Sequence, residues 1–186
     1  MLTCDELAAS KKLFRPRREN LLTTLPVWSK EYDIKFDLFA FYLPDSFVNI
    51  FHVTKGGNND DYGDRIPSIY AKGGNNPFLH ICSSISGNKN YCKNYNISSS
   101  TWISLRISQN KVENESYVFE CSIDNIVLDT IENELPLEFE SVKVYASNPW
   151  VPAFNGILRN VEICYKGNVV IYPRYFWDKS SLFKNK

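Results

Sequence analysis

The densest group of side chains able to bind a metal ion lies in residues 55–65. Amide and carboxylate oxygens occur there at Asn58, Asp60, Asp61 and Asp64, on a backbone that several glycines make flexible. Hard oxygen ligands of this kind suit Ca²⁺, so these four residues are the predicted calcium ligands. Their spacing does not follow the EF-hand pattern. The alternative is a long loop between strands, in which glycine and asparagine accept positive φ.

Four side chains are the predicted ligand contacts. Tyr62 and Arg65 belong to the same loop, whereas Asn148 and Trp150 belong to a second loop that contains two prolines. Arg65 can bind a carboxylate or sulfate through two parallel hydrogen bonds, or it can pair with an acidic neighbour in its own loop. Trp150 can stack on a sugar ring beside Asn148, or it can close one end of the fold.

The cysteines predict one specific cross-link. Cys82 and Cys92 are equidistant from a turn centred on Gly87, so they face each other across a hairpin. A non-hydrogen-bonded pair of this kind can form a disulfide in an oxidising compartment. Cys121 and Cys164 lie between apolar neighbours, which predicts either buried thiols or a second bridge.

The two histidines, His52 and His80, give no sign of catalysis. Each lies in an apolar segment, and neither is accompanied by a serine or cysteine nucleophile and an acid at a recognisable spacing. We therefore expect structural or surface-facing roles for both histidines, and a protein that is not an enzyme.

Composition excludes several classes of partner. The chain has 21 basic and 21 acidic residues and a net charge of zero, which removes the electrostatic basis for binding nucleic acid or an anionic membrane. Its apolar runs fall short of the roughly 18–20 residues needed to cross a bilayer. With 44% hydrophobic and 15% aromatic residues, the chain can bury a substantial core.

Short segments with alternating polarity, separated by Gly, Asn, Asp and Pro, predict an all-β domain. Residues 1–20 form a polar lead-in, 21–175 the domain and 176–186 a tail. Trp102 is expected to pack between two sheets. The predicted strands are 31–42, 47–54, 66–71, 78–85, 90–96, 101–109, 116–124, 126–131, 138–147, 156–165 and 168–173.

Two sequons, at Asn96 and Asn114, offer sites for N-glycosylation beside predicted turns. The first residues lack the apolar core of a signal peptide. The sequons and cysteines together favour an extracellular compartment, and a cytoplasmic protein is the alternative.

The order of these segments resembles the concanavalin A-like lectin/glucanase superfamily, and within it laminin-G-like modules. The opening strand Glu31-Tyr-Asp-Ile-Lys-Phe-Asp-Leu38 and the ending Gly156-Ile-Leu-Arg-Asn-Val-Glu-Ile163 carry much of the likeness. Val118-Phe-Glu-Cys-Ser-Ile-Asp124 lies between them. The resemblance implies a two-sheet antiparallel jelly-roll sandwich of about twelve strands.

Proteins of this superfamily are either binding modules or glycosidases. The glycosidases carry Glu-x-Asp-x-x-Glu on one strand, which places acids as nucleophile, helper and proton donor. The nearest segment here begins at Glu31 and Asp33 but has Phe36 in place of the last acid. The resemblance therefore implies a non-catalytic module that recognises a glycan or a protein in adhesion. A glycoside hydrolase, or a purely structural or oligomerisation domain, is the alternative.

Overall fold

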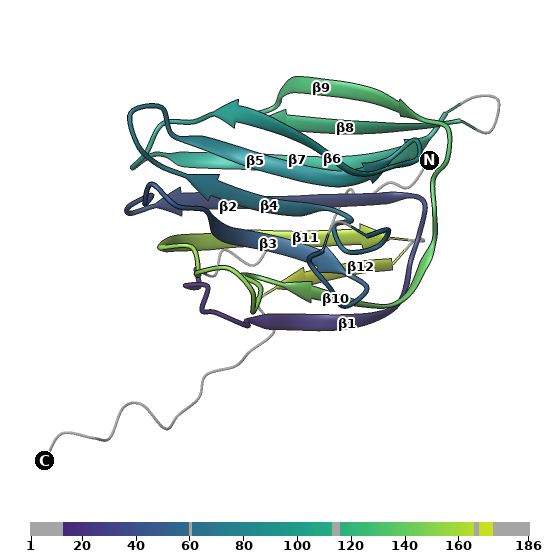
Figure 1. Ribbon diagram of the computed structural model, residues 1–186, viewed down its shortest axis with the longest axis horizontal. Helices are drawn as coiled ribbons and strands as arrows, with labels where there is room; N and C mark the ends of the chain where they lie inside the picture. Colours follow the sequence, from purple (N-terminus) through teal and green to yellow (C-terminus); the bar gives the residue numbers. More distant parts are fainter. Residues whose placement is uncertain (1–12, 60, 113–115, 166–167, 173–186) are drawn as a thin grey trace, which may run out of the picture.

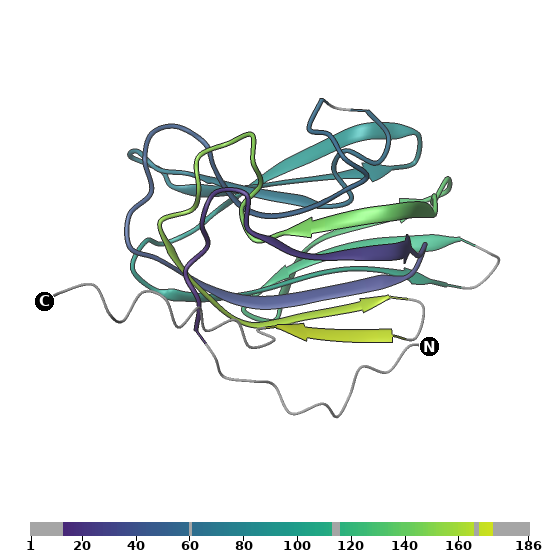
Figure 2. The same cartoon turned by 90° about the horizontal axis from the view of Figure 1, so that it is seen from below.

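The computed structural model describes residues 13–59, 61–112, 116–165 and, as backbone, 168–172. Within these residues the secondary structure consists of twelve β-strands in two six-stranded antiparallel sheets, and no helix occurs among them. The strands of both sheets run in similar directions across the molecule (Figure 1), and the view turned by 90° shows them from below (Figure 2). The prediction of a two-sheet jelly-roll sandwich is confirmed.

The first sheet has the order β1-β10-β3-β4-β5-β6. Its strands are β1 (Leu21–Trp28), β10 (Phe139–Tyr145), β3 (Val48–Thr54), β4 (Ser68–Lys72), β5 (Phe78–Ile85) and β6 (Asn88–Asn96). The second sheet has the order β12-β11-β2-β7-β8-β9. Its strands are β12 (Asn168–Tyr172), β11 (Gly156–Tyr165), β2 (Tyr32–Ala40), β7 (Trp102–Lys111), β8 (Tyr117–Ile123) and β9 (Ile126–Asn133).

Strand β2 shows how alternation in the sequence becomes two faces. Its odd-numbered members from Asp33 to Phe39 are partly exposed, and the residues between them are buried. Phe36 of β2 packs against Phe51 of β3, with ring centroids 5.3 Å apart, so the core lies between the sheets. Side chains that face away from this core form the two outer surfaces of the sandwich.

All eleven predicted segments coincide with strands, but no strand was predicted over the residues of β1. Pro26 lies within β1 and cannot donate a hydrogen bond to a neighbouring strand. Proline is tolerated here because β1 is the edge strand of the first sheet, paired with β10 alone. The residues before β1 also contact the sandwich, since Phe14 forms a bridge with Leu158.

The prediction for Trp102 is wrong. Its side chain lies on the outer surface of the second sheet and is 37% exposed. Residues alternate along β7, and Ile103, Leu105 and Ile107 take the inward positions. Trp102 therefore points outward, where it packs against Phe39 with ring centroids 5.5 Å apart.

Candidate functional site

Six rings follow one another across the outer surface of the first sheet, and we call them the aromatic row. They come from strands β10, β3, β4 and β5 and from the loops before β3 and after β10. Successive ring centroids lie 6.2, 5.6, 6.2, 6.2 and 5.2 Å apart. In order, the row consists of Tyr145, Trp150, His52, Tyr70, His80 and Phe47.

The strand register explains why these rings meet. Tyr70 of β4 lies directly opposite His80 of β5, so their side chains project from the same face. The middle of the row is covered, because His52 is fully buried and Tyr70 nearly so. Trp150 and Phe47, towards its two ends, are 42% and 40% exposed. The row thus presents two accessible aromatic platforms joined by a buried centre.

His52 is held by hydrogen bonds at both ring nitrogens. Its Nε2 donates to the Asp64 carbonyl at 2.6 Å, and its Nδ1 accepts from Asn148 Nδ2 at 2.8 Å. This arrangement requires the neutral ring with the proton on Nε2. Burial lowers the pKa of His52 to about 4, and Arg65 adds to that effect. A neutral ring with both nitrogens engaged stabilises the loops and is poorly suited to proton transfer.

Asn148 is fully buried, so the structure corrects its predicted role as a ligand contact. Its Oδ1 accepts from the backbone N–H groups of Trp150 and Val151, at 3.1 and 2.9 Å. Its own backbone N–H donates to Asn49 Oδ1 at 2.7 Å. Asn148 therefore fixes the loop that carries Trp150.

Arg65 ties the 55–65 loop to the sheet. Its guanidinium donates to Asn58 Oδ1 at 3.0 Å and to Asn90 Oδ1 at 2.8 Å, and it lies 5.7 Å above the Tyr70 ring. The Tyr70 hydroxyl donates to the same Asn58 oxygen at 2.6 Å, and burial raises the pKa of Tyr70. Arg65 remains partly exposed beside the row. Its hydrogen bonds to Asn58 and Asn90 involve amide oxygens, and both predicted roles of Arg65 stay predictions.

The oxygens predicted to bind calcium take part in the folding of their own loop. Asp64 Oδ2 accepts from the backbone N–H groups of Asn59 and Asp61, at 2.7 and 3.4 Å. Asp61 Oδ1 pairs with Lys89 at 3.1 Å on the surface. Asp60 lies outside the described residues. Calcium binding by this loop remains a proposal.

The predicted disulfide between Cys82 and Cys92 is present and joins β5 to β6. His80 Nε2 lies 3.2 Å from Cys82 Sγ. These three residues are the sole cluster of three potential metal ligands in the described part of the chain, but two of them are in the disulfide. Cys164 also forms a disulfide, and Cys121 is a buried thiol whose pKa burial raises to about 12.

The two predicted glycosylation sites differ in what the structure describes. Asn96 ends β6 and is exposed, as modification requires. Asn114 lies outside the described residues. Glycosylation of either residue stays a prediction.

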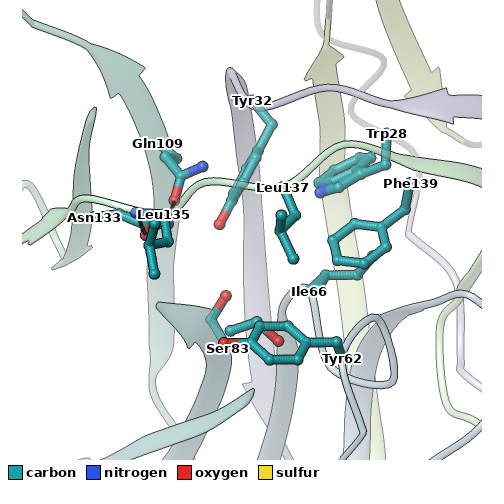
Figure 3. Close-up of a pocket in the computed structure, with 11 residues that line it drawn as sticks. Trp28, Tyr32, Tyr62, Ile66, Ser83, Gln109, Asn133, Leu135, Leu137 and Phe139 are labelled. Atoms are coloured by element: carbon teal, nitrogen blue, oxygen red, sulfur yellow. Dashed lines mark hydrogen bonds between the residues drawn. The ribbon is translucent and has the colours of Figure 1, made fainter. Parts of the chain in front are cut away.

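Tyr62 does not join the aromatic row. It borders a hollow between the two sheets, together with Trp28, Ile66 and Phe139 (Figure 3). Sequence reasoning missed this hollow because Trp28 ends the unpredicted strand β1. It also missed Phe47, which precedes β3 and gives no periodic signal of its own.

Comparison with known proteins supports the fold alone. No model of a known protein family matches the sequence, and no curated protein is detectably similar to it. The structure is similar to a native heptameric SAP-like pentraxin from Limulus polyphemus, with a TM-score of 0.54 and 12% identity over 81% of this chain and 74% of the pentraxin. It is also similar to the alginate lyase Aly36B, with a TM-score of 0.50 and 11% identity over 87% and 80% of the two chains.

These likenesses define the class of protein as a two-sheet jelly-roll sandwich, consistent with a concanavalin A-like fold. None of the described residues forms a helix that could cross a membrane.

Proposed function

We propose that this protein is a non-catalytic recognition module that binds a glycan across the outer surface of the first sheet. The observation that carries the proposal is the pair of platforms in the aromatic row, Trp150 and Phe47, each about 40% exposed. Aromatic faces stack on the apolar faces of sugar rings. Because Asn148 and His52 hold the Trp150 loop through buried hydrogen bonds, little conformational freedom is lost on binding.

Binding is a better function for this surface than catalysis. The nitrogens of His52 are engaged at both ends, as described above. Asp33, one acid of the incomplete glycosidase pattern, lies on the other sheet and accepts hydrogen bonds from Arg106 at both carboxylate oxygens. A glycosidase needs two acids facing a bound sugar across a groove. We therefore favour recognition over hydrolysis.

The disulfides of the protein support an extracellular compartment. The disulfide between Cys82 and Cys92, and the one that includes Cys164, are typical of an oxidising compartment. The exposed sequon at Asn96 is compatible with passage through a secretory pathway. We propose an extracellular role in adhesion, similar to that of laminin-G-like modules. The proposal of sugar binding is also supported by the similarity to the alginate lyase Aly36B, a protein of the same fold whose name says that it acts on a polysaccharide.

The test is a glycan array on the non-reduced chain, run with calcium and again with chelator. We expect binding to one class of sugar, and about tenfold weaker binding by Trp150→Ala through lost stacking. Trp102→Ala is the matched control, because Trp102 has a similar exposure on the opposite surface. Equal effects of the two substitutions would contradict the proposal.

The calcium arm tests the predicted metal site separately. Binding that requires calcium would support Asn58, Asp61 and Asp64 as part of a metal site, with Asp60 completing the predicted set. Binding that persists in chelator would leave glycan recognition in place without a metal. Absence of binding across the array would favour a protein ligand or a structural domain.

A further inference from the structure

The charges of the chain are divided unequally between the two sheets, although the whole chain is neutral. The strands of the first sheet contain one acid, Glu140, and lysines at positions 72, 89, 93 and 143. Strands β3, β4, β5 and β6 have no Asp or Glu in their sequences, whereas the strands of the second sheet contain more acids than bases. The aromatic row therefore crosses the sheet that has the surplus of positive charge.

Two of these lysines have no acidic partner. Lys89 and Lys93 are ion-paired with aspartates, at 3.1 and 2.8 Å. Within the residues that the structure describes, Lys72 and Lys143 form no ion pair. Their charges are available to a negatively charged ligand.

Lys72 lies at the Phe47 end of the aromatic row. It follows Tyr70 by two residues in β4, so both side chains project from the outer face of the sheet. Its Nζ is 5.7 Å from the centre of the Phe47 ring, near the outer limit of a cation–π contact. Asp45 precedes Phe47 in the same loop, but no ion pair joins it to Lys72 in the described part of the chain. The exposed ring and the ammonium group thus lie side by side.

Lys143 lies near the other end of the row. Its neighbours in β10, Val142 and Val144, are buried in the core, so Lys143 projects outward, and it is exposed. It precedes Tyr145 by two residues on the same face, and the Tyr145 ring contacts Trp150. Each of the two aromatic platforms therefore has a lysine towards its end of the row.

The spacing of the platforms sets the length of the ligand. Three rings of the row lie between Trp150 and Phe47, so a ligand that reaches both platforms is an oligosaccharide. A chain of acidic sugars repeats its charge along its length and can meet both lysines. Complementary charge of this kind contributes mainly to specificity and to the rate of association.

We propose that the aromatic row binds an acidic glycan, whose carboxylate or sulfate groups pair with Lys72 and Lys143 while sugar rings stack on Phe47 and Trp150. This inference rests on the function proposed above and names the class of glycan. A glycan is favoured over an acidic peptide because the exposed rings offer faces on which sugar rings stack.

The test is calorimetric titration of the intact chain with two matched pairs of oligosaccharides. The first pair is tetragalacturonate and its methyl ester, and the second is a sulfated galactan oligosaccharide and its desulfated form. We expect the acidic member of at least one pair to bind about tenfold more tightly than its neutral counterpart. Concentrated NaCl should reduce this difference, because it screens exposed charges. The pair that responds identifies carboxylate or sulfate as the recognised group.

Substitution of single lysines locates the interaction. Lys72→Gln and Lys143→Gln should each weaken binding of the acidic glycan about threefold to fivefold and leave binding of the neutral form unchanged. Lys35→Gln is the matched control, because it removes the same charge from a partly exposed side chain on the second sheet. It should leave the affinity for both forms unchanged.

Three results would overturn the proposal. Equal affinities for the acidic and neutral members of both pairs would exclude an acidic ligand and leave glycan recognition in place. Equal effects of Lys35→Gln and Lys72→Gln would attribute binding to the overall charge of the protein. An oligoglutamate that binds as tightly as the acidic glycan would favour an acidic peptide. Failure of the proposed function itself looks different, because no member of either pair and no glycan on the array would then bind.

Discussion

The two outer surfaces of the sandwich are built from different chemistry. On the second sheet, Arg106 donates to both carboxylate oxygens of Asp33 at 2.9–3.1 Å, and Arg159 donates to Asp37 at 2.8 Å. These partners lie on neighbouring strands and are partly exposed to solvent. On the first sheet, amide side chains flank the aromatic row, and the hydrogen bonds that join Asn148 to Asn49 and His52 are buried.

One tryptophan on each surface, Trp102 and Trp150, shows how the neighbours of an exposed ring differ. Trp102 and Trp150 are similarly exposed, yet the guanidinium of Arg159 lies 3.8 Å from the centre of the Trp102 ring. Trp150 instead meets His52 and Tyr145 at interplanar angles of 54° and 71°. A cation covers one ring face of Trp102, whereas Trp150 is supported by tilted rings. The comparison indicates that exposure alone does not make a stacking platform.

The largest expected effect concerns the buried network of the first sheet. Asn148→Ala removes the acceptor for two backbone N–H groups and the partner of His52 Nδ1. We expect the free energy of unfolding to fall by about 4 kcal/mol, because several buried polar groups lose partners together. Urea denaturation measures this loss. Asn94→Ala, at an exposed site beside His80, is the control and should cost less than about 1 kcal/mol. Equal losses of stability in Asn148→Ala and Asn94→Ala would contradict the special role of the buried network.

Acid should weaken the same network. The pKa of His52 is 6.5 in the unfolded chain and about 4 in the folded protein, so the unfolded chain binds a proton first as the pH falls. Stability is therefore intact above about pH 6.5 and decreases by about 3 kcal/mol as the pH falls to about 4. Urea unfolding at a series of pH values measures the slope. His52→Gln, which cannot titrate, should flatten it.

Protonation of Glu162, on the second sheet, should have the opposite effect on the free energy of unfolding. Burial raises the pKa of Glu162. The negative charges of Asp33 and Asp37 raise it further, and the positive charge of Lys35 opposes the shift. The folded protein therefore binds this proton before the unfolded chain does, and acidification favours folding at this site. Glu162→Gln should make the acid-induced loss of stability steeper. An unchanged slope would show that Glu162 has no such role.

A smaller loss should follow removal of the covalent tie within the first sheet. The disulfide between Cys82 and Cys92 joins residues 10 apart in the chain. Replacing both cysteines with alanine should lower the free energy of unfolding by about 2–3 kcal/mol, since the unfolded chain regains freedom. Thermal and urea unfolding of the double variant measure it. The double variant should still form the β5–β6 hairpin, which far-ultraviolet circular dichroism would check.

The smallest effect belongs to the ion pairs of the second sheet. Arg106→Gln should cost less than about 1 kcal/mol, because exposed salt bridges are screened by water and salt. The difference from the unsubstituted protein should shrink further in concentrated NaCl. A loss comparable to that of Asn148→Ala would show that the two surfaces are not energetically distinct.

Most of the strands and one disulfide can be predicted from local patterns in the sequence. Period-two alternation was enough for eleven strands, because a half-buried strand requires it. Symmetric spacing about Gly87 was enough for the Cys82–Cys92 disulfide, because an antiparallel hairpin aligns such pairs. Local pattern failed at β1, where Pro26 is acceptable only because the strand lies at an edge. Edge position is a property of the whole sheet.

The roles of the candidate site residues depend on how distant segments of the chain pack together. Arg65 and Trp150 lie beside or within one row of rings, Tyr62 borders a different hollow, and Asn148 is buried beneath its loop. His52, Arg65 and Asn148 are far apart in sequence and meet because β3, the following loop and the loop after β10 converge. Which polar side chain faces solvent and which satisfies a buried neighbour depends on that convergence, and the spacing of residues along one chain does not encode it.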